Sequence, residues 1–375
     1  MFERLKELLA RAWNAVRGAF RAVFAWLAAP FVRGGAWVYG RRWWIKGPII
    51  ALLALLIVSY GYFFVQTQRW TGFDTNYVAG LSFMAAPAAA SAETEPVGGD
   101  DGVLRTCTRS GIVEATAALI DFNVNQNAWI SSMVLYNMGF FGISWDRTPF
   151  FDNKAAFQRG VNQAVRRTTV ELVDSLGRVR GTSQVDQALQ NARGSMQFDE
   201  YTWYFGLDPF GPKTPTPSFY RSAIRDLNAF NERLEACQTV LDARADNLVQ
   251  FLDRIANDIG STSAILRERS ENYNSGWFDT RADDRFWFAY GQLYGYHGIL
   301  LGARHDFQDV IATRGLEALW QSMEDQMTSA LRIQPTIISN GREDGWIMPT
   351  HLATMGFYIL RFRSNLVEVR QVLDR

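Results

Sequence analysis

The stretch from Pro217 to Tyr273, PSFYRSAIRDLNAFNERLEACQTVLDARADNLVQFLDRIANDIGSTSAILRERSENY, carries apolar residues at regular helical spacing. Steps of three, four or seven residues separate them, which places them on one face of an α-helix. Such a stripe is typical of helices that pack side by side in a bundle. The stretch therefore predicts one or two long bundled helices. The apolar positions include Ile224, Leu227, Phe230, Leu234, Cys237, Leu241, Leu248, Leu252, Ile255 and Ile259.

The same spacing recurs between Asn153 and Gly177, and the glycine is a common helix terminator. No alternating pattern of comparable strength indicates β-strands. The segments 140–153 and 201–217 are rich in aromatic residues, Gly and Pro, and they are predicted to be ordered loops. The sequence therefore predicts an all-α helical bundle.

Composition and charge narrow the class of protein. The chain has 375 residues, of which 48% are hydrophobic and 20% charged, so it can bury a sizeable core. Residues 1–69 contain ten Lys or Arg and two Glu, whereas the remainder contains 28 basic and 36 acidic residues, a net charge of −8. An acidic main domain argues against nucleic acid as a partner, because phosphate binding needs a basic surface. The basic N-terminal part suits an anionic membrane leaflet.

Residues 47–68 contain no charged side chain, and Pro48 to Val65 form a mostly apolar run. Eighteen helical residues cover about 27 Å of a bilayer core that is roughly 30 Å thick. Three basic residues precede the run, which predicts a cytoplasmic N-terminus and an exported main domain. A cleaved signal peptide fits less well, because about 46 residues precede the run and the nearest Ala-x-Ala sites lie too far beyond it.

Four parts are therefore expected along the chain. The N-terminal part combines helically spaced apolar residues with basic ones, which is typical of a helix lying on the cytoplasmic membrane surface; a partner-binding or orienting helix is the alternative. A small, acidic, Pro- and Gly-containing composition near 85–102 indicates a linker. The parts are a basic amphipathic segment (1–46), a transmembrane helix (47–68), a membrane-proximal segment with a flexible linker (69–102), and an exported helical domain (103–375).

The two cysteines, Cys107 and Cys237, both fall in the part predicted to be exported, where an oxidising compartment permits one disulfide. Two separate buried thiols are the alternative. Neither cysteine has the spacing of a metal or redox motif, and no cofactor or metal is expected.

Four glycines lie four, three and four residues apart in one predicted helix: Gly291, Gly295, Gly298 and Gly302. A glycine inside a helix costs about 1 kcal/mol relative to alanine, so close approach of a neighbouring backbone must offset the cost. The seam therefore predicts a helix-packing or partner-binding face rather than a ligand groove. A second membrane span from Phe286 to Ala303 is disfavoured, because this segment contains three Tyr, Gln292 and a His.

Acidic residues and histidines near the C-terminal third are the weak candidates for catalysis. Carboxylates with different environments can divide acid and base roles, and His can assist them. For the two adjacent aspartates, helix capping is the simpler interpretation. The spacing matches no zinc, P-loop, dinucleotide or nucleophile-elbow motif. The candidates are Asp283, Asp284, His297, Glu343, Asp344 and His351.

Three stretches carry a family resemblance: GWFDTRADDRFWFAYGQLYGYHGIL (Gly276 to Leu300), SNGREDGWIMPTHLATMGFYILRFRSNLVEVRQVLDR (Ser339 to Arg375) and DNKAAFQRGVNQAV (Asp152 to Val165). They resemble the bacterial inner-membrane family known as domain of unknown function 2333. The resemblance implies a membrane-anchored, envelope-facing helical protein of Gram-negative type. It implies no reaction and no catalytic residue.

Three functions remain open. The preferred hypothesis is a single-pass inner-membrane protein whose periplasmic domain binds or organises another envelope protein; its partners would be the lipid bilayer and that protein, with no nucleic acid. A periplasmic hydrolase that uses the acidic and histidine residues of 276–351 is the first alternative. A lipid- or ligand-binding protein is the second. Whether the chain is an enzyme is left open.

Overall fold

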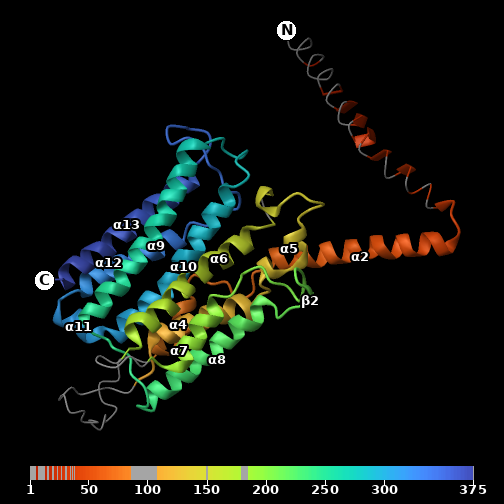
Figure 1. Ribbon diagram of the computed structural model, residues 1–375. Coiled ribbons are helices and arrows are strands. Elements are labelled where there is room, and N and C mark those ends of the chain that lie inside the picture. Colours follow the sequence, from red (N-terminus) through yellow and green to blue (C-terminus); the bar gives the residue numbers. More distant parts are fainter. Residues whose placement is uncertain are drawn as a thin grey trace. The chain divides into compact units, whose positions relative to one another are not determined.

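The computed structural model describes residues 39–85, 108–148, 151–178 and 185–374, together with scattered positions between Lys6 and Trp37 (Figure 1). The chain divides into two compact units, Met1–Phe63 and Phe64–Arg375. In the described part, helix α2 (Trp43–Gln68) is the one helix long and apolar enough to cross a membrane. It contains the predicted span. The predicted amphipathic segment, residues 1–46, lies mostly outside the described residues and stays a prediction.

Helices dominate the unit that begins at Phe64, so the predicted all-α fold is confirmed. The region from Pro217 to Tyr273, for which one or two long helices were expected, forms two, α8 and α9. The helices are α3 (Ser82–Ala85), α4 (Gly111–Asp121), α5 (Val134–Met138), α6 (Asn153–Glu171), α7 (Gln187–Met196), α8 (Thr216–Glu235), α9 (Ala245–Asn272), α10 (Ala282–Asp306), α11 (Gln308–Thr313), α12 (Glu317–Leu331) and α13 (His351–Leu373). Short 3₁₀ or π turns are η1 (Tyr77–Gly80), η2 (Phe122–Gln126), η3 (Ile130–Ser132), η4 (Trp145–Arg147) and η5 (Leu172–Leu176).

The loop before α8 contains a small antiparallel hairpin, β1 (Phe205–Leu207) and β2 (Phe210–Pro212). Three residues per strand are too few to give a detectable alternation of apolar and polar positions, which explains why the sequence predicted only a loop here.

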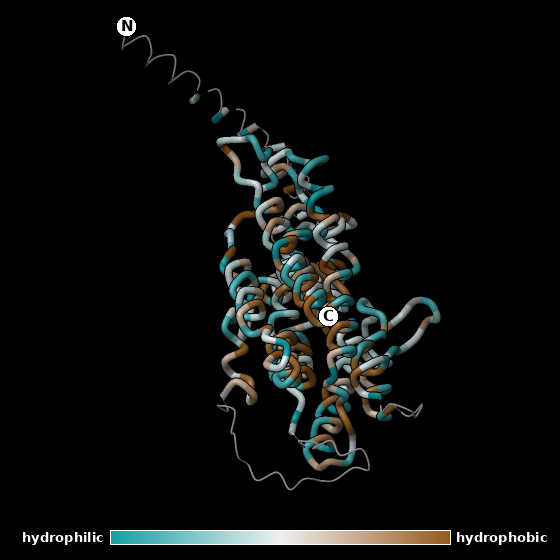
Figure 2. Tube along the Cα trace, turned by 90° about the vertical axis from the view of Figure 1, so that its left-hand side faces the viewer, coloured by the Kyte–Doolittle hydropathy of each residue, from teal (hydrophilic) through white to brown (hydrophobic). Residues whose placement is uncertain are grey.

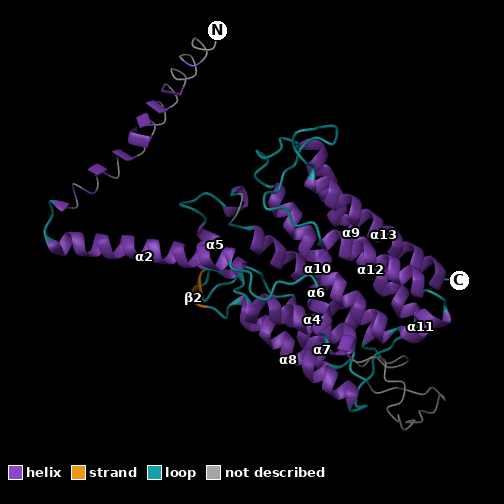
Figure 3. Ribbon diagram, turned by 180° about the vertical axis from the view of Figure 1, so that it is seen from behind, coloured by secondary structure: helices purple, strands orange, loops and turns teal. Residues whose placement is uncertain are grey.

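Helix α10 forms the centre of the domain. It packs against α6 and α4 on one side and against α9, α12 and α13 on the other (Figures 1 and 3). Helix α6 in turn packs against α7, and α4 packs against α8. Figure 2 shows hydrophobic and hydrophilic positions interspersed along the helices. Because neighbours surround α10, its rings are buried on several sides; Phe286, Tyr290, Tyr294 and Tyr296 are all fully buried.

The glycine seam allows this close packing. A Cβ atom at Gly291 would collide with the backbone carbonyl of Phe157 in α6, and one at Gly302 would collide with the backbone of Gly111 in α4. Gly295 faces Ala164 of α6 in the same way. The seam therefore lies in helix-packing contacts inside the domain, where it presents no surface to a partner.

The segment after α2 is built into the same core. Trp70 packs its ring against Phe157 and Trp287, with centroids 5.1 Å apart in each case. Tyr77 stacks on Tyr294 at 4.3 Å, and its hydroxyl donates to the Tyr294 carbonyl oxygen at 2.8 Å. The folded domain thus includes residues near 70–81, well before the predicted start at 103. The aromatic residues of this segment are not spaced at a helical repeat, so the sequence pattern did not predict that they are buried.

Candidate functional site

Two loops meet at one end of the α9–α10 and α12–α13 helix pairs and form a structured tip. The α9–α10 loop supplies residues 273–281, and the α12–α13 loop supplies residues 332–350. Isolated bridges join Asn340 to Gly276 of the first loop and to Thr350 of its own loop. The tip is therefore formed by two loops that backbone bridges at Asn340 hold together.

Asn340 is the central anchor of the tip. Its side chain is fully buried, and its Nδ2 lies within hydrogen-bond distance of the Arg269 carbonyl (3.1 Å), the Tyr273 carbonyl (3.1 Å) and Asp279 Oδ2 (2.9 Å). Since a buried polar group without partners is costly, this network strongly favours one conformation of both loops.

Arg269, which is partly buried, and the buried Asp279 form an ion pair beside Asn340. The Arg269 Nε lies 3.0 Å from Asp279 Oδ2, and a second, shorter contact joins Nη2 to Oδ1. The guanidinium also lies 4.0 Å from the ring centre of Tyr273. The hydrogen bonds to Asp279 raise the pKa of Arg269, so the guanidinium stays charged across the physiological range.

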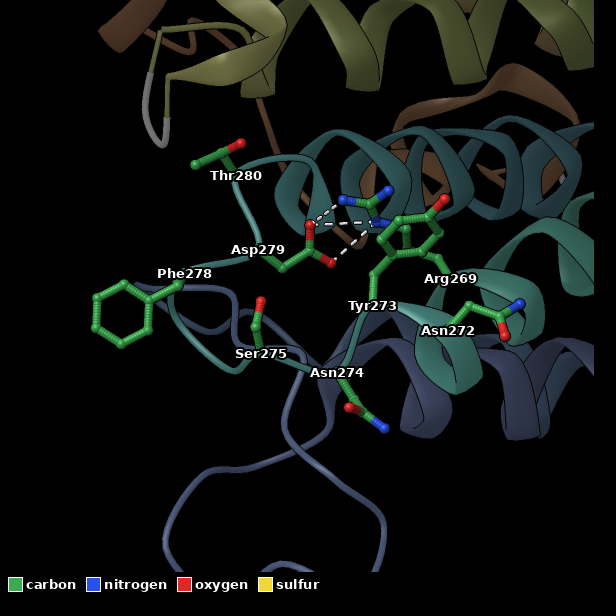
Figure 4. A pocket seen from close by; sticks show the side chains of 8 residues that line it. All are labelled: Arg269, Asn272, Tyr273, Asn274, Ser275, Phe278, Asp279 and Thr280. Atoms are coloured by element: carbon green, nitrogen blue, oxygen red, sulfur yellow. Dashed lines mark hydrogen bonds and ion pairs between the residues drawn. The ribbon is translucent and has the colours of Figure 1, made fainter.

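A pocket of about 410 Å³ opens beside this ion pair (Figure 4). In Figure 4 Phe278 points away from the Arg269–Asp279 pair, while the ring of Tyr273 lies close to the guanidinium. The lining is mainly polar, and the charges are already paired with each other. The pocket can therefore accept polar groups of a ligand or partner, and it contains no free acid–base pair. Its lining residues are Arg269, Asn272, Tyr273, Asn274, Ser275, Phe278, Asp279 and Thr280.

Large apolar side chains stand exposed on the same two loops. Trp346 is 94% exposed and Phe278 81% exposed, and Trp277 and Ile347 are also largely exposed. Exposed aromatic residues on a fixed backbone are typical of protein–protein contact surfaces, because little conformational entropy is lost when they are buried. We refer to Trp277, Phe278, Trp346 and Ile347 as the tip surface.

Asp283 and Asp284 lie close to the tip, in the first turn of α10, where the structure brings them together with Asp152 at the start of α6. The carboxyl groups of Asp152 and Asp284 lie close enough to influence each other's ionisation. Asp152 is fully buried, and neither of its carboxyl oxygens has a hydrogen-bond partner among the described residues. Because both carboxyl groups are removed from water, ionisation of one disfavours ionisation of the other.

The surroundings of the pair favour the protonated form. Burial, followed by the charges of Asp284 and Asp283, raises the pKa of Asp152 far above its usual range. Burial and then Asp284 raise the pKa of Asp283 to about 7. Arg159 lies nearby and donates to the Tyr201 hydroxyl at 3.0 Å. Helix capping was the simpler interpretation of Asp283 and Asp284, but it does not account for their burial beside a third carboxyl group.

The other predicted catalytic residues lie elsewhere. His297 is buried in the middle of α10, and burial lowers its pKa to about 4. His351 accepts a hydrogen bond from the Ser339 amide at 2.9 Å, and burial lowers its pKa. Glu343 and Asp344 lie on the exposed tip loop. These residues do not join the carboxyl pair in a common cleft.

Metal ligation was not expected from the sequence. Across the described ranges, no group of three or more His, Cys, Asp or Glu side chains is placed to hold a metal ion. The predicted disulfide involves Cys107, which lies outside the described residues, so that bond stays a prediction.

Several site residues, among them Asp152 and Asn340, were not among the candidates identified from the sequence. Asp152 directly precedes a helix, and Asn340 lies in a loop without any motif. Their role is recognisable only from their burial in the folded domain, and the burial of a polar residue leaves no local signal in the sequence.

Comparison with known proteins bears on the family. Residues 122–276 match the model of a family described as an uncharacterized protein conserved in bacteria (DUF2333). The predicted resemblance is confirmed over this region. The DUF2333 match contains Asp152, Arg159 and Arg269, and it ends at Gly276, before α10 and the second tip loop. No curated protein and no solved structure matches the chain. Because DUF2333 is described without an activity, the functional argument rests on the geometry.

Proposed function

We propose that the chain is a single-pass protein of the bacterial inner membrane, whose helical domain lies in the periplasm and binds another envelope protein. The apolar helix α2 supports the anchor, and the basic residues before it support a cytoplasmic N-terminus. The acidic charge of the remaining chain agrees with an exported, non-nucleic-acid-binding domain.

The tip surface is the observation that carries partner binding. Trp346 and Phe278 remain in water at a cost of roughly 25 cal/mol for each Å² of apolar area. Mobile loops could hide such rings, but the buried Asn340 and the Arg269–Asp279 pair stabilise the two loops in one conformation. Protein interfaces often have exposed aromatic residues at their centre and polar residues around them. The tip surface beside the polar pocket has this arrangement.

The experiment places a photo-cross-linking amino acid at Trp346 and, in a second strain, at Phe278 of the full-length chain in living cells. A third strain carries it at Glu232, an exposed position on α8. The proposal predicts one discrete cross-linked protein from both tip positions and none from Glu232. The purified protein found in this way should then bind the wild-type chain and lose most of its affinity for a Phe278→Ser, Trp346→Ser variant. Equal labelling at all three positions, or no product at the tip, would contradict the proposal.

The alternatives receive less support from the geometry. A hydrolase would need an acid, a base and a substrate cleft together, whereas His297 and His351 lie apart from the carboxyl pair and Asp152 is fully buried. A lipid-binding domain would need an apolar chamber, whereas the pocket at the tip is lined mainly by polar side chains.

A further inference from the structure

We propose that a second exposed apolar surface of the domain lies in the headgroup region of the bilayer that holds α2. This inference rests on the membrane anchor proposed above. Two adjacent elements form the surface: the turn that follows α5 and the β1–β2 hairpin with the residues before it. We call it the membrane rim and define it as Met138, Phe140, Phe141, Ile143, Trp203, Tyr204, Phe205 and Phe210.

The final turn of α2 is held by contacts with the domain. Helix α2 runs without a break to Gln68, and its last residues, from Phe64 onward, already belong to the compact domain. The buried Lys154 of α6 donates to the carbonyl of Gln66 at 2.9 Å and to that of Arg69 at 2.6 Å. Since the apolar run extends to Val65, the domain surface around Phe64 must lie at the membrane boundary when α2 spans the bilayer.

A continuous row of rings leads from this point to the rim. Phe64 contacts Phe151 with centroids 5.7 Å apart, and Phe151 contacts Trp145 at 5.3 Å. Trp145 lies 5.9 Å from Phe140, which meets Phe141 at 4.9 Å. Phe141 is 72% exposed. The exposed turn is thus packed directly onto the end of the anchor helix.

The hairpin adjoins this turn. The rings of Tyr136 and Tyr201 are stacked at 6.5 Å, and the Asn137 side chain donates to the Tyr201 carbonyl at 3.2 Å. Phe210 at the hairpin end is 79% exposed. In Figures 1 and 3, α5 and β2 lie on one side of the domain, whereas α13 lies on the opposite side.

The residue types of the rim fit a lipid surface. No charged residue occurs from Met133 to Trp145, and the segment Tyr201–Leu207 is likewise uncharged. Trp and Tyr are enriched at membrane–water interfaces, where the ring enters the apolar boundary and the polar atom stays hydrated. The uncharged, aromatic membrane rim therefore suits lipid headgroups better than it suits a soluble protein partner.

The test uses the full-length chain reconstituted into vesicles of phosphatidylethanolamine and phosphatidylglycerol. A small fluorescent amino acid replaces Phe141 in one variant and Phe210 in another. A matched control replaces Phe357, an exposed phenylalanine of α13, and an anchor control replaces Ile57 in α2. Lipids brominated near the headgroup quench those probes that enter the membrane boundary, and lipids brominated deep in the acyl chain quench the anchor control at Ile57.

The inference predicts that the brominated lipids remove most of the fluorescence at Phe141 and Phe210 and leave the probe at Phe357 unchanged. Quenching at Ile57 together with no quenching at Phe141 and Phe210 would overturn the inference while leaving the anchor intact. An unquenched probe at Ile57 would instead refute the anchor, and the inference would fail with it.

Discussion

The ammonium group of Lys154 lies 2.6 Å from the carbonyl oxygen of Arg69, directly after the last turn of α2. A second bond reaches the Gln66 carbonyl, so one buried cation satisfies two backbone acceptors that the end of a helix leaves without helical partners. The contact fixes the end of the predicted membrane helix to α6. Gln66 and Arg69 are thereby held in the domain.

Replacing this lysine tests how firmly α2 is attached. Lys154→Met should destabilise the full-length protein in detergent by about 1–3 kcal/mol, because hydrogen bonds to a charged group are lost and two carbonyls remain buried without partners. Thermal unfolding measures the change. The control is Lys213→Met, since Lys213 also donates to a carbonyl, that of Asp208, but at the surface. An equal effect of both substitutions would show that the buried cap has no special role.

Replacing a glycine of the seam and a glycine outside it with alanine should change stability in opposite directions. Gly291→Ala should destabilise by about 1–3 kcal/mol, because its Cβ would collide with the Phe157 carbonyl and force α10 and α6 apart. Gly194→Ala in α7 meets no atom within 4 Å and should stabilise by about 0.5–1 kcal/mol through the better helix propensity of alanine. Chemical or thermal denaturation distinguishes the two. A neutral or stabilising Gly291→Ala would contradict the close-packing interpretation.

The tip depends on Asn340. Asn340→Ala should raise the rate of amide hydrogen exchange across residues 273–280 and lower stability by about 1–3 kcal/mol, because the Arg269 and Tyr273 carbonyls and Asp279 Oδ2 lose the side-chain amide that they share. Asn272→Ala is the control, as Asn272 lies in the same region but is exposed. Unchanged exchange in the Asn340 variant would mean that the tip is held by other contacts.

Asp283 gives a prediction on pH. Its pKa is raised to about 7, so the folded state binds the proton more tightly than the unfolded state does. Its favourable contribution is therefore complete below about pH 4 and is lost as the pH rises to about 7. Asp283→Asn cannot ionise, and it should gain a few kcal/mol over the wild type at pH 8, at about 1.4 kcal/mol per pKa unit, and little at pH 4.

The wild type and the Asp283→Asn variant must be compared at each pH. The reason is that His297, with its lowered pKa, makes the stability of both proteins rise with pH between about pH 4 and 6.5, opposite to the effect of Asp283. Asp309→Asn, at an exposed position, controls for the loss of one negative charge. A stability difference between the Asp283 variant and wild type that stays constant from pH 4 to pH 8 would contradict the proposed burial of this carboxyl group.

The sequence predicted those features that repeat locally. The apolar steps of α8 and α9, and the uncharged run of α2, each extend over several turns, and each predicted its element. The seam of α10 was recognised from Gly291 to Gly302, because the cost of helical glycines demands a close neighbour. Which neighbour it is, α6 or a partner protein, depends on the tertiary fold and could not be read from spacing.

The site residues depend on contacts between distant segments. Asp152 meets Asp284 only because α6 and α10 cross, and Asn340 anchors a loop that is formed by other helices. Neither residue belongs to a motif. Trp70 and Tyr77 were likewise assigned to a membrane-proximal segment, because isolated aromatic residues in a short irregular stretch carry no periodic signal.

Membrane anchoring by α2, with the domain exported, is the central claim. Its most direct test fuses alkaline phosphatase, which is active only outside the cytoplasm, after Arg42 and after Arg375 in a Gram-negative host. The account predicts enzyme activity for the fusion at Arg375 alone. An inactive fusion at Arg375, together with fluorescence from green fluorescent protein fused at the same position, would place the domain in the cytoplasm and contradict the account.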